Sequence, residues 1–170
     1  GYHWQSRDPP ATRQVNLVNR VGPTDCPLAR DVERYSANGV VVHSGGAAVS
    51  RDLVHGLQDA GYRVKFTYMP YWYYTEMGSP DLSGLPSLWG SSYGTNRAGN
   101  RRDNLGTVSP AAFSGYGNVD MKMLQYTSTG QPGNLDFNVY KGTAAQFRDY
   151  LYGTSTTAPQ RPRRHRAEED

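Results

Sequence analysis

Cysteine is almost absent from this chain, which has one, Cys26, in 170 residues. A single cysteine excludes an internal disulfide framework and any zinc site built from several thiolates. Cys26 lies between Asp25 and Pro27 with no histidine close by, so we interpret it as a buried or unreactive thiol. His43 and His55 lack metal-ligand spacing to any acid or cysteine. We therefore expect neither a metal site nor a cofactor.

Long hydrophobic runs are missing as well. No apolar stretch approaches the roughly 18 residues that a membrane-spanning helix needs, so no span is expected. The chain also lacks an initiator methionine and a signal peptide, and its abrupt start at Gly1 suggests a cut or processed end. The net charge of +3 is compatible with an anionic cell wall but gives no argument for nucleic acid. The arginine-rich run 161–166 is followed at once by acidic residues, which favours a solvated linker.

Aromatic residues, in contrast, are plentiful: 13 Tyr, 3 Trp and 4 Phe, alongside 19 Gly and 11 Pro. Tyrosine and tryptophan combine an apolar face with a polar tip. Such side chains suit stacking on sugars as well as half-buried packing, and composition alone leaves both roles open.

Short apolar runs alternate with helical stretches along most of the chain. We predict strands over 1–5, 27–33, 63–69, 87–93, 121–127 and 135–139. The β-branched run 40–43 fits either a strand or an extended loop. Alternation of this kind predicts an α/β fold with a parallel sheet or barrel. A full eight-unit barrel needs roughly 200 residues or more, so about six β/α units fit this chain and eight do not. Residues 1–153 would form this domain, and 154–170 a Pro/Arg-rich linker or disordered tail.

Three helices accompany these strands in the prediction. The first covers 9–21, and the second runs from a cap at Ser50 to a stop at Gly61. The third follows Thr143 as its cap. Its residues expected to face inward are Ala144, Phe147 and Leu151.

Two groups of acidic residues stand at the ends of predicted strands. Asp31 and Glu33 are two residues apart, so on a strand they point to the same side, with Cα atoms roughly 6.6 Å apart. Cleavage of a glycosidic bond needs a protonated acid and a second carboxylate, and paired carboxylates raise one pKa. A solvated cluster with Arg30 and Arg34 is the alternative. Asp136 follows a Gly/Pro turn, and its sequence context fits a residue that caps this turn as well as it fits a catalytic residue.

Several motifs in this order resemble glycoside hydrolase family 25, the Chalaropsis-type lysozymes of bacteriophages and bacteria. The run QYTSTGQPGNLDFNVYKGT, over 125–143, is similar to the closing segment of that family. Tyr2-His3-Trp4 looks like its third strand, and Asp31-Val32-Glu33 looks like its fourth-strand D-x-E motif. The segments 65–72 and 88–93 resemble its fifth and sixth strands. Order and spacing hold over residues 1 to about 152.

The resemblance implies an incomplete (β/α)8-type, TIM-like barrel, with residues 1–153 as a partial catalytic barrel. It also implies a muramidase that cleaves the β-1,4 bond between N-acetylmuramic acid and N-acetylglucosamine in bacterial peptidoglycan, at the cell wall. By that analogy Glu33 is the general acid and later the base, Asp31 tunes Glu33, and Asp136 lines the same mouth. The resemblance leaves open whether an enzyme carboxylate or the acetamide of the substrate attacks. The aromatic residues expected to bind substrate are Tyr2, Tyr68, Trp72, Trp89, Tyr93 and Tyr126.

The chain also departs from the family pattern. The family begins with an aspartate-bearing strand and a second strand, and neither precedes Gly1. We therefore expect a fragment or processed piece with weak activity, unless a partner chain or different packing completes the barrel. Two further hypotheses are a module that binds cell wall without cutting it and a structural part of a phage particle. An enzyme of this kind would be secreted, released by a holin or carried on the virion.

Overall fold

The computed structural model describes residues 2–4, 26–37, 40–43, 45–94 and 98–153. The helix predicted over 9–21 and the tail 154–170 lie outside these residues. Among the helices of the described part, none is both long enough and apolar enough to cross a membrane.

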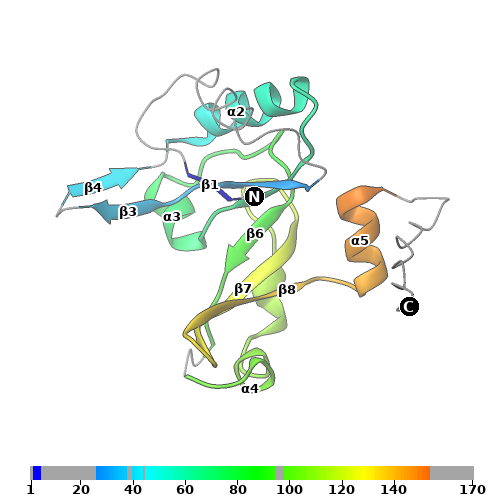
Figure 1. Cartoon of the computed structure of the whole chain (residues 1–170). Coiled ribbons are helices and arrows are strands. Elements are labelled where there is room, and N and C mark those ends of the chain that lie inside the picture. The colour runs from blue at the N-terminus through cyan, green and yellow to red at the C-terminus, as the bar shows by residue number, and fades with distance from the viewer. Residues whose placement is uncertain (1, 5–25, 38–39, 44, 95–97, 154–170) are drawn as a thin grey trace, which may run out of the picture.

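A six-stranded sheet forms the centre of the molecule (Figure 1). Its strands follow in space the order β1 (Tyr2–Trp4), β2 (Leu28–Asp31), β5 (Val64–Tyr68), β6 (Leu88–Ser91), β7 (Met121–Gly130) and β8 (Leu135–Tyr140). The first five are parallel to their neighbours. The sheet curls into part of a barrel and is consistent with the incomplete barrel expected from the sequence. All six predicted strands are present with shifted ends.

The last strand corrects the prediction of a regular β/α repeat, because β8 runs antiparallel to β7. Only residues 131–134 connect the two strands, and Gly133 and Asn134 turn the chain with φ angles of 93° and 53°. A parallel neighbour would need a crossover of a dozen or more residues. The connection is too short for this, so the chain folds back as a hairpin.

Helix α2 (Ala47–Asp59) covers one face of the sheet. Its buried residues Leu53, Val54 and Leu57 are those predicted, and Gly61 ends the turn with a φ of 88°. The helix begins earlier than predicted, with Gly46 as the N-cap. Ser50 is therefore a fully buried residue inside the helix rather than its cap.

Two stretches of ambiguous or loop-like sequence form regular structure. Residues 40–43 are a strand, β4 (Val40–His43), which pairs antiparallel with β3 (Arg34–Ala37) in a separate two-stranded sheet. The short helices α3 (Tyr71–Glu76) and α4 (Arg101–Leu105) were not predicted. Both begin after a residue in extended conformation, Pro70 for α3 and Asn100 for α4, and the Asn100 side chain accepts two backbone N–H bonds of α4.

The hydrophobic core lies between α2 and the sheet and continues toward β6 and β7. Leu28, Val32 and Val64 from the sheet join Leu53 and Leu57 of α2 in one cluster. Cys26 is exposed, which corrects the expectation of a buried thiol. That this thiol is unreactive stays a prediction.

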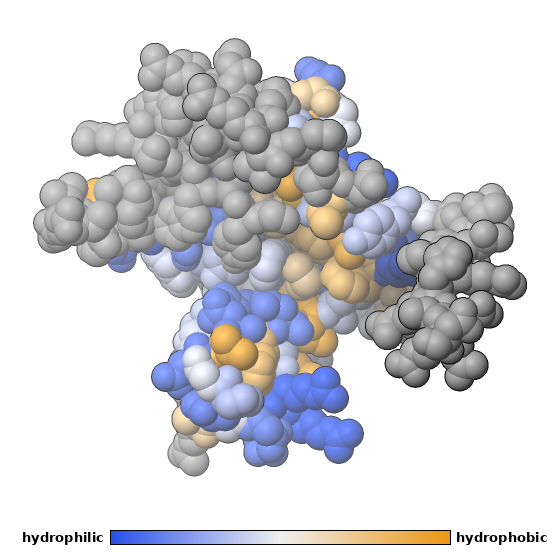
Figure 2. All heavy atoms as spheres, viewed as in Figure 1, coloured by the Kyte–Doolittle hydropathy of each residue, from blue (hydrophilic) through white to orange (hydrophobic). Residues whose placement is uncertain are grey.

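Helix α5 (Ala144–Tyr152) begins as predicted, with a capping box between Thr143 and Gln146. It packs against Phe66 and Tyr140 through Phe147, with ring centroids 6.4 and 4.8 Å apart. Ala144 is exposed, which corrects its predicted inward position. A cleft of about 340 Å³ remains between α5 and the sheet. Hydrophobic side chains gather in this region in Figure 2.

Candidate functional site

The D-x-E segment lies where β2 ends. Because successive side chains of an extended segment face opposite sides, Asp31 points away from Val32, which is fully buried in the core. Asp31 pairs with Tyr68 of the neighbouring strand β5 and is only 2 % exposed. Burial, followed by repulsion from Glu33, raises the pKa of Asp31 to about 7, while Arg30 opposes this shift.

Glu33 comes after the strand rather than inside it, because β2 ends at Asp31. The backbone N–H of Val32 still donates to the carbonyl of Tyr68 at 2.8 Å, which holds the segment against β5. Glu33 is half-buried. Its pKa is raised, first by burial and then by the negative charge of Asp136. This repulsion shows that the two carboxylates lie within electrostatic range although 103 positions separate them (136 − 33).

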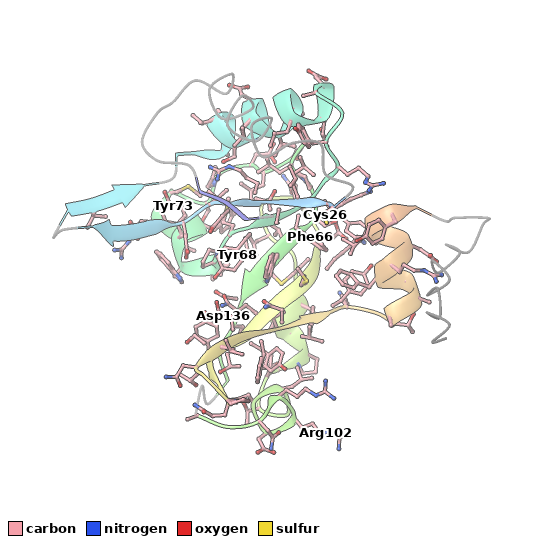
Figure 3. The ribbon with its side chains drawn as sticks, in the orientation of Figure 1. Cys26, Phe66, Tyr68, Tyr73, Arg102 and Asp136 are labelled. Carbon is pink, nitrogen blue, oxygen red and sulfur yellow. The ribbon has the colours of Figure 1, made fainter. Side chains whose placement is uncertain are left out.

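Tyr93 marks the region that these acids share. Its pKa is raised by burial and by the charges of Asp136 and Glu33, and lowered by a hydrogen bond with Tyr68. Its side chain is 40 % exposed, so the ring reaches both the acids and solvent. In Figure 3, Tyr68 on β5 and Asp136 on β8 extend toward the same region. The structure therefore brings Asp31, Glu33 and Asp136 together with Tyr68 and Tyr93.

Two polar residues of this region were missed by the sequence analysis. The hydroxyl of Tyr68 donates to Oε1 of Gln125 at 2.6 Å, and Nε1 of Trp89 donates to Oδ1 of Asn138 at 2.8 Å. Trp89 also packs edge-on against Tyr68, with ring centroids 5.4 Å apart. The signal was available, because Asn138 follows Asp136 by two positions on one strand and so shares its face.

The remaining aromatic residues named from the sequence have different surroundings. Trp72 of α3 is 45 % exposed, and the guanidinium of Arg34 lies 5.1 Å from its ring centroid. Arg34 is held in turn by Glu76 at 2.9 Å. Tyr2 lies on β1 opposite Ala29, and its side chain is outside the described part of the structure.

Tyr126 belongs to the hydrophobic core. It is 4 % exposed, and its ring centroid lies 6.2 Å from that of Phe137. As the neighbour of Gln125 on β7, it points to the opposite face of the strand. We therefore correct its sequence-based assignment to the groove wall and leave it out of the candidate site.

Two carboxylic acids with raised pKa values, beside exposed and half-buried aromatic rings, form a site that can hold a proton near neutral pH and donate it. Such an acid next to a second carboxylate is the arrangement that glycoside cleavage requires. Among the described residues there is no group of three or more histidine, cysteine, aspartate or glutamate side chains that could hold a metal ion.

Comparison with known proteins gives the fold. No family model matches the sequence, and no curated protein matches it significantly. Among solved structures, a muramidase from Acremonium alcalophilum aligns with a TM-score of 0.61 at 18% identity, covering 89% of this chain and 72% of that one. A family 25 lysozyme from Aspergillus fumigatus aligns with a TM-score of 0.60 at 14% identity, covering 85% and 68%.

The chain has the fold of the family 25 lysozymes. The catalytic domain of an endolysin from a bacteriophage of Listeria monocytogenes is also similar, with a TM-score of 0.54 at 14% identity over 90% of this chain and 69% of that domain. The resemblance seen in the sequence motifs is thus confirmed at the level of the fold. These neighbours are glycoside hydrolases, and identities this low carry the architecture alone.

Proposed function

We propose that this family 25-like chain is a peptidoglycan hydrolase, a muramidase that cleaves the β-1,4 bond between N-acetylmuramic acid and N-acetylglucosamine. The observation that carries the proposal is the convergence of Glu33 and Asp136, on segments far apart in sequence, in a fold otherwise found in muramidases. Bacterial peptidoglycan is the substrate, and the chain acts at the cell wall.

In this proposal Glu33 is the general acid. Burial and the charge of Asp136 favour its protonated form, so that it donates a proton to the glycosidic oxygen as the bond breaks. After the leaving group departs, the Glu33 carboxylate takes a proton from the attacking water. Asp136 faces the same region and stabilises the positive charge that develops on the sugar ring.

Asp31 acts through Glu33 in this scheme. Its burial and raised pKa keep it largely protonated below about pH 7, so that it adds little negative charge beside the substrate. Tyr68, Trp89 and Tyr93 line the region of the acids, and the hydrogen bonds to Gln125 and Asn138 fix two of these rings. Trp72, held by Arg34, offers an exposed ring further out. Rings of this kind stack on the apolar faces of sugars.

The test is the chemistry of the products. The chain is incubated with purified peptidoglycan, and the new reducing ends are reduced with borohydride and identified by mass spectrometry. A muramidase leaves reduced N-acetylmuramic acid. Reduced N-acetylglucosamine alone would indicate a different bond, and the absence of new reducing ends at high enzyme concentration would contradict hydrolysis.

We further propose that the 170-residue chain alone is impaired relative to its structural neighbours. Strand β1 pairs only with β2 among the described strands, so the other edge of β1 has no described partner strand beside the site. The same assay, run in parallel with the Acremonium alcalophilum muramidase, is expected to show at least about tenfold less product per enzyme. Equal rates would contradict the impairment without touching the assignment of the bond.

A module that binds the wall without cutting it is the second candidate function. The exposed rings of Trp72 and Tyr93 favour it, because they provide sugar contacts whether or not Glu33 transfers a proton. Binding to peptidoglycan without any new reducing ends would be the result in its favour.

A further inference from the structure

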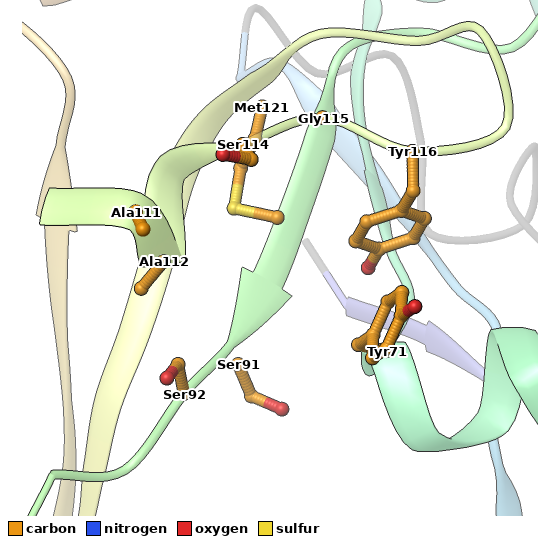
Figure 4. A pocket seen from close by; sticks show the side chains of 9 residues that line it. All are labelled: Tyr71, Ser91, Ser92, Ala111, Ala112, Ser114, Gly115, Tyr116 and Met121. Atoms are coloured by element: carbon orange, nitrogen blue, oxygen red, sulfur yellow. The ribbon is translucent and has the colours of Figure 1, made fainter. Parts of the chain in front are cut away.

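A cavity of about 480 Å³ opens beside the end of β6 (Figure 4). Its volume lies within the roughly 300–1,000 Å³ of typical small-molecule sites. The residues that line it come from four segments: Tyr71, Ser91, Ser92, Ala111, Ala112, Ser114, Gly115, Tyr116 and Met121. None of the lining side chains is charged, so the cavity suits a neutral ligand rather than a metal ion or a phosphate.

The cavity shares no lining residue with the acid site, because neither the three carboxylates nor the rings of Tyr68, Trp89 and Tyr93 belong to its walls. Met121 is part of the hydrophobic core, and its side chain crosses Gly90, where an added Cβ would stand 2.5 Å from Cε of Met121. The missing side chain of Gly90 thus leaves room for Met121, which forms one wall of the cavity. Trp89, which precedes Gly90 on β6, faces the region of the acids. A ligand in the cavity would therefore contact a different set of side chains from those of the acid site.

The aromatic side of the cavity is built rigidly. The hydroxyl of Tyr116 donates to the backbone carbonyl of Met69, and the ring packs on Tyr74 with centroids 4.7 Å apart. Tyr71 packs edge-on against Tyr116 at 5.3 Å, yet it remains 56 % exposed. Tyr71 is thus held in place while one part of its ring stays open to solvent, as a platform for sugar stacking requires.

The opposite side combines hydroxyl groups with small apolar groups. Ser91, Ser92 and Ser114 supply hydroxyls that both donate and accept hydrogen bonds. Ala111 and Ala112, from the 3-10 turn Pro110–Phe113, and Met121 supply apolar surface. An N-acetylated sugar matches this mixture, since its acetamido methyl needs an apolar niche, its amide and hydroxyls need polar partners, and its ring needs an aromatic face.

We propose that this cavity is a second carbohydrate site, which binds an N-acetylhexosamine unit of the wall glycan beside the end of β6, on residues distinct from those of the acid site. The choice of wall glycan rests on the proposed function. A second site would hold the insoluble polymer while the acid site acts on another stretch of it, because two linked contacts raise the effective concentration of the substrate.

The test measures binding in the Glu33→Gln protein, in which hydrolysis does not interfere. The probes are the linear tetramer of N-acetylglucosamine and the tetramer of glucose, which has the same linkage without acetamido groups. Ala111→Phe fills the cavity from an exposed position. Ala145→Phe, at an exposed position of α5, is the matched control. Tyr71→Ala is a second variant that removes the platform.

The N-acetylglucosamine tetramer is expected to bind with a second, separable site, which Ala111→Phe and Tyr71→Ala weaken by about tenfold, ~1.4 kcal/mol. Ala145→Phe should leave both sites unchanged. Three results would overturn the proposal. They are tetramer binding that Ala111→Phe leaves unchanged, binding of the glucose tetramer as strong as that of the N-acetylglucosamine tetramer, and no binding of the N-acetylglucosamine tetramer to the Glu33→Gln protein. If the cavity variants weaken the second site but the wild-type chain releases no reducing ends from peptidoglycan, the carbohydrate site stands and the hydrolase is refuted.

Discussion

Asp31 and Glu33 differ in how completely the fold removes them from water. Asp31 is 2 % exposed, whereas Glu33 is half-buried and lies beyond the end of β2. The pKa of each is raised first by burial and then by a neighbouring carboxylate, Glu33 for the first and Asp136 for the second. Glu33 is thus repelled by Asp136 and in turn repels Asp31, and protonation of these carboxylates removes the repulsion.

The raised pKa of Asp31 makes the stability of the fold depend on pH. The unfolded residue has a pKa of 3.8 and the folded one about 7, so between these values the folded state binds the additional proton. Stability is then greatest below the unfolded pKa and falls as pH rises through 7. Over this window the loss is about 4 kcal/mol, because the two pKa values differ by about 3 units at roughly 1.4 kcal/mol per unit. Chemical denaturation from pH 4 to 8 measures it.

Asp31→Asn should remove this component and make the free energy of unfolding flatter across the same window. Asp52→Asn, at an exposed position of α2, is the control and should follow the wild-type curve. A pH dependence that Asp31→Asn leaves intact, or one that rises toward pH 7 because of Asp31, would show that this carboxyl is not buried in the way described.

The repulsion between Asp136 and Glu33 gives a prediction about catalysis. Asp136→Asn removes a negative charge, so the pKa of Glu33 should fall and the acid should lose its proton at lower pH. The alkaline limb of the profile of kcat/KM against pH is therefore expected to move toward acid by roughly 0.5–1 unit. Rates of peptidoglycan hydrolysis from pH 4 to 9 give this limb. Asp52→Asn should not move it, and a shift toward alkali would contradict the proximity of the two acids.

At the scale of elements, local sequence signals predicted where several strands and helices lie, but they did not predict the direction of β8 or the start of α2. The alternation of Val64, Phe66 and Tyr68 located β5, and Thr143 as a cap located the start of α5. The antiparallel course of β8 was missed, although the predicted strands 121–127 and 135–139 leave only seven residues between them, too few for a parallel crossover. The start of α2 was missed because Ser50 is a good local cap, whereas burial against the sheet places it inside the helix.

The candidate site was predictable in part. The periodicity of two placed Asp31 and Glu33 on one side, but only the sheet order brings Asp136 beside them. Tyr126 was assigned to the groove because its neighbours match a motif, and the strand turns it into the core instead. Which face of a strand meets solvent depends on what packs over it, and the sequence of β7 alone does not contain that information.

The capping box of α5 provides a prediction at this scale. The Thr143 hydroxyl accepts the N–H of Gln146 at 3.2 Å, and the Gln146 side chain accepts the N–H of Thr143 at 2.8 Å. Thr143→Ala removes one of these bonds and should lower the free energy of unfolding by about 1 kcal/mol. Thr143→Ser keeps the hydroxyl and should restore most of it, as measured by urea denaturation. A loss equal in both variants would mean that the cap is not the cause.

At the scale of the whole molecule, the curled sheet is what makes the site. It carries β2 and β8 to one region although they are the second and last strands of the sheet in space. Helix α2 and the core on the opposite face hold β2 and β5 in position, so the acids depend on packing that no short segment can supply. The central claim is that this assembly makes Glu33 a proton donor.

Lysis of purified cell walls by Glu33→Gln tests that claim most directly, with binding to the same walls measured by sedimentation. The account predicts that the rate falls by about 10²–10⁴-fold while binding stays within about twofold, because glutamine keeps the shape and loses the proton. The control Asp59→Asn, at the exposed end of α2, should retain full activity. Undiminished lysis by Glu33→Gln would contradict the account.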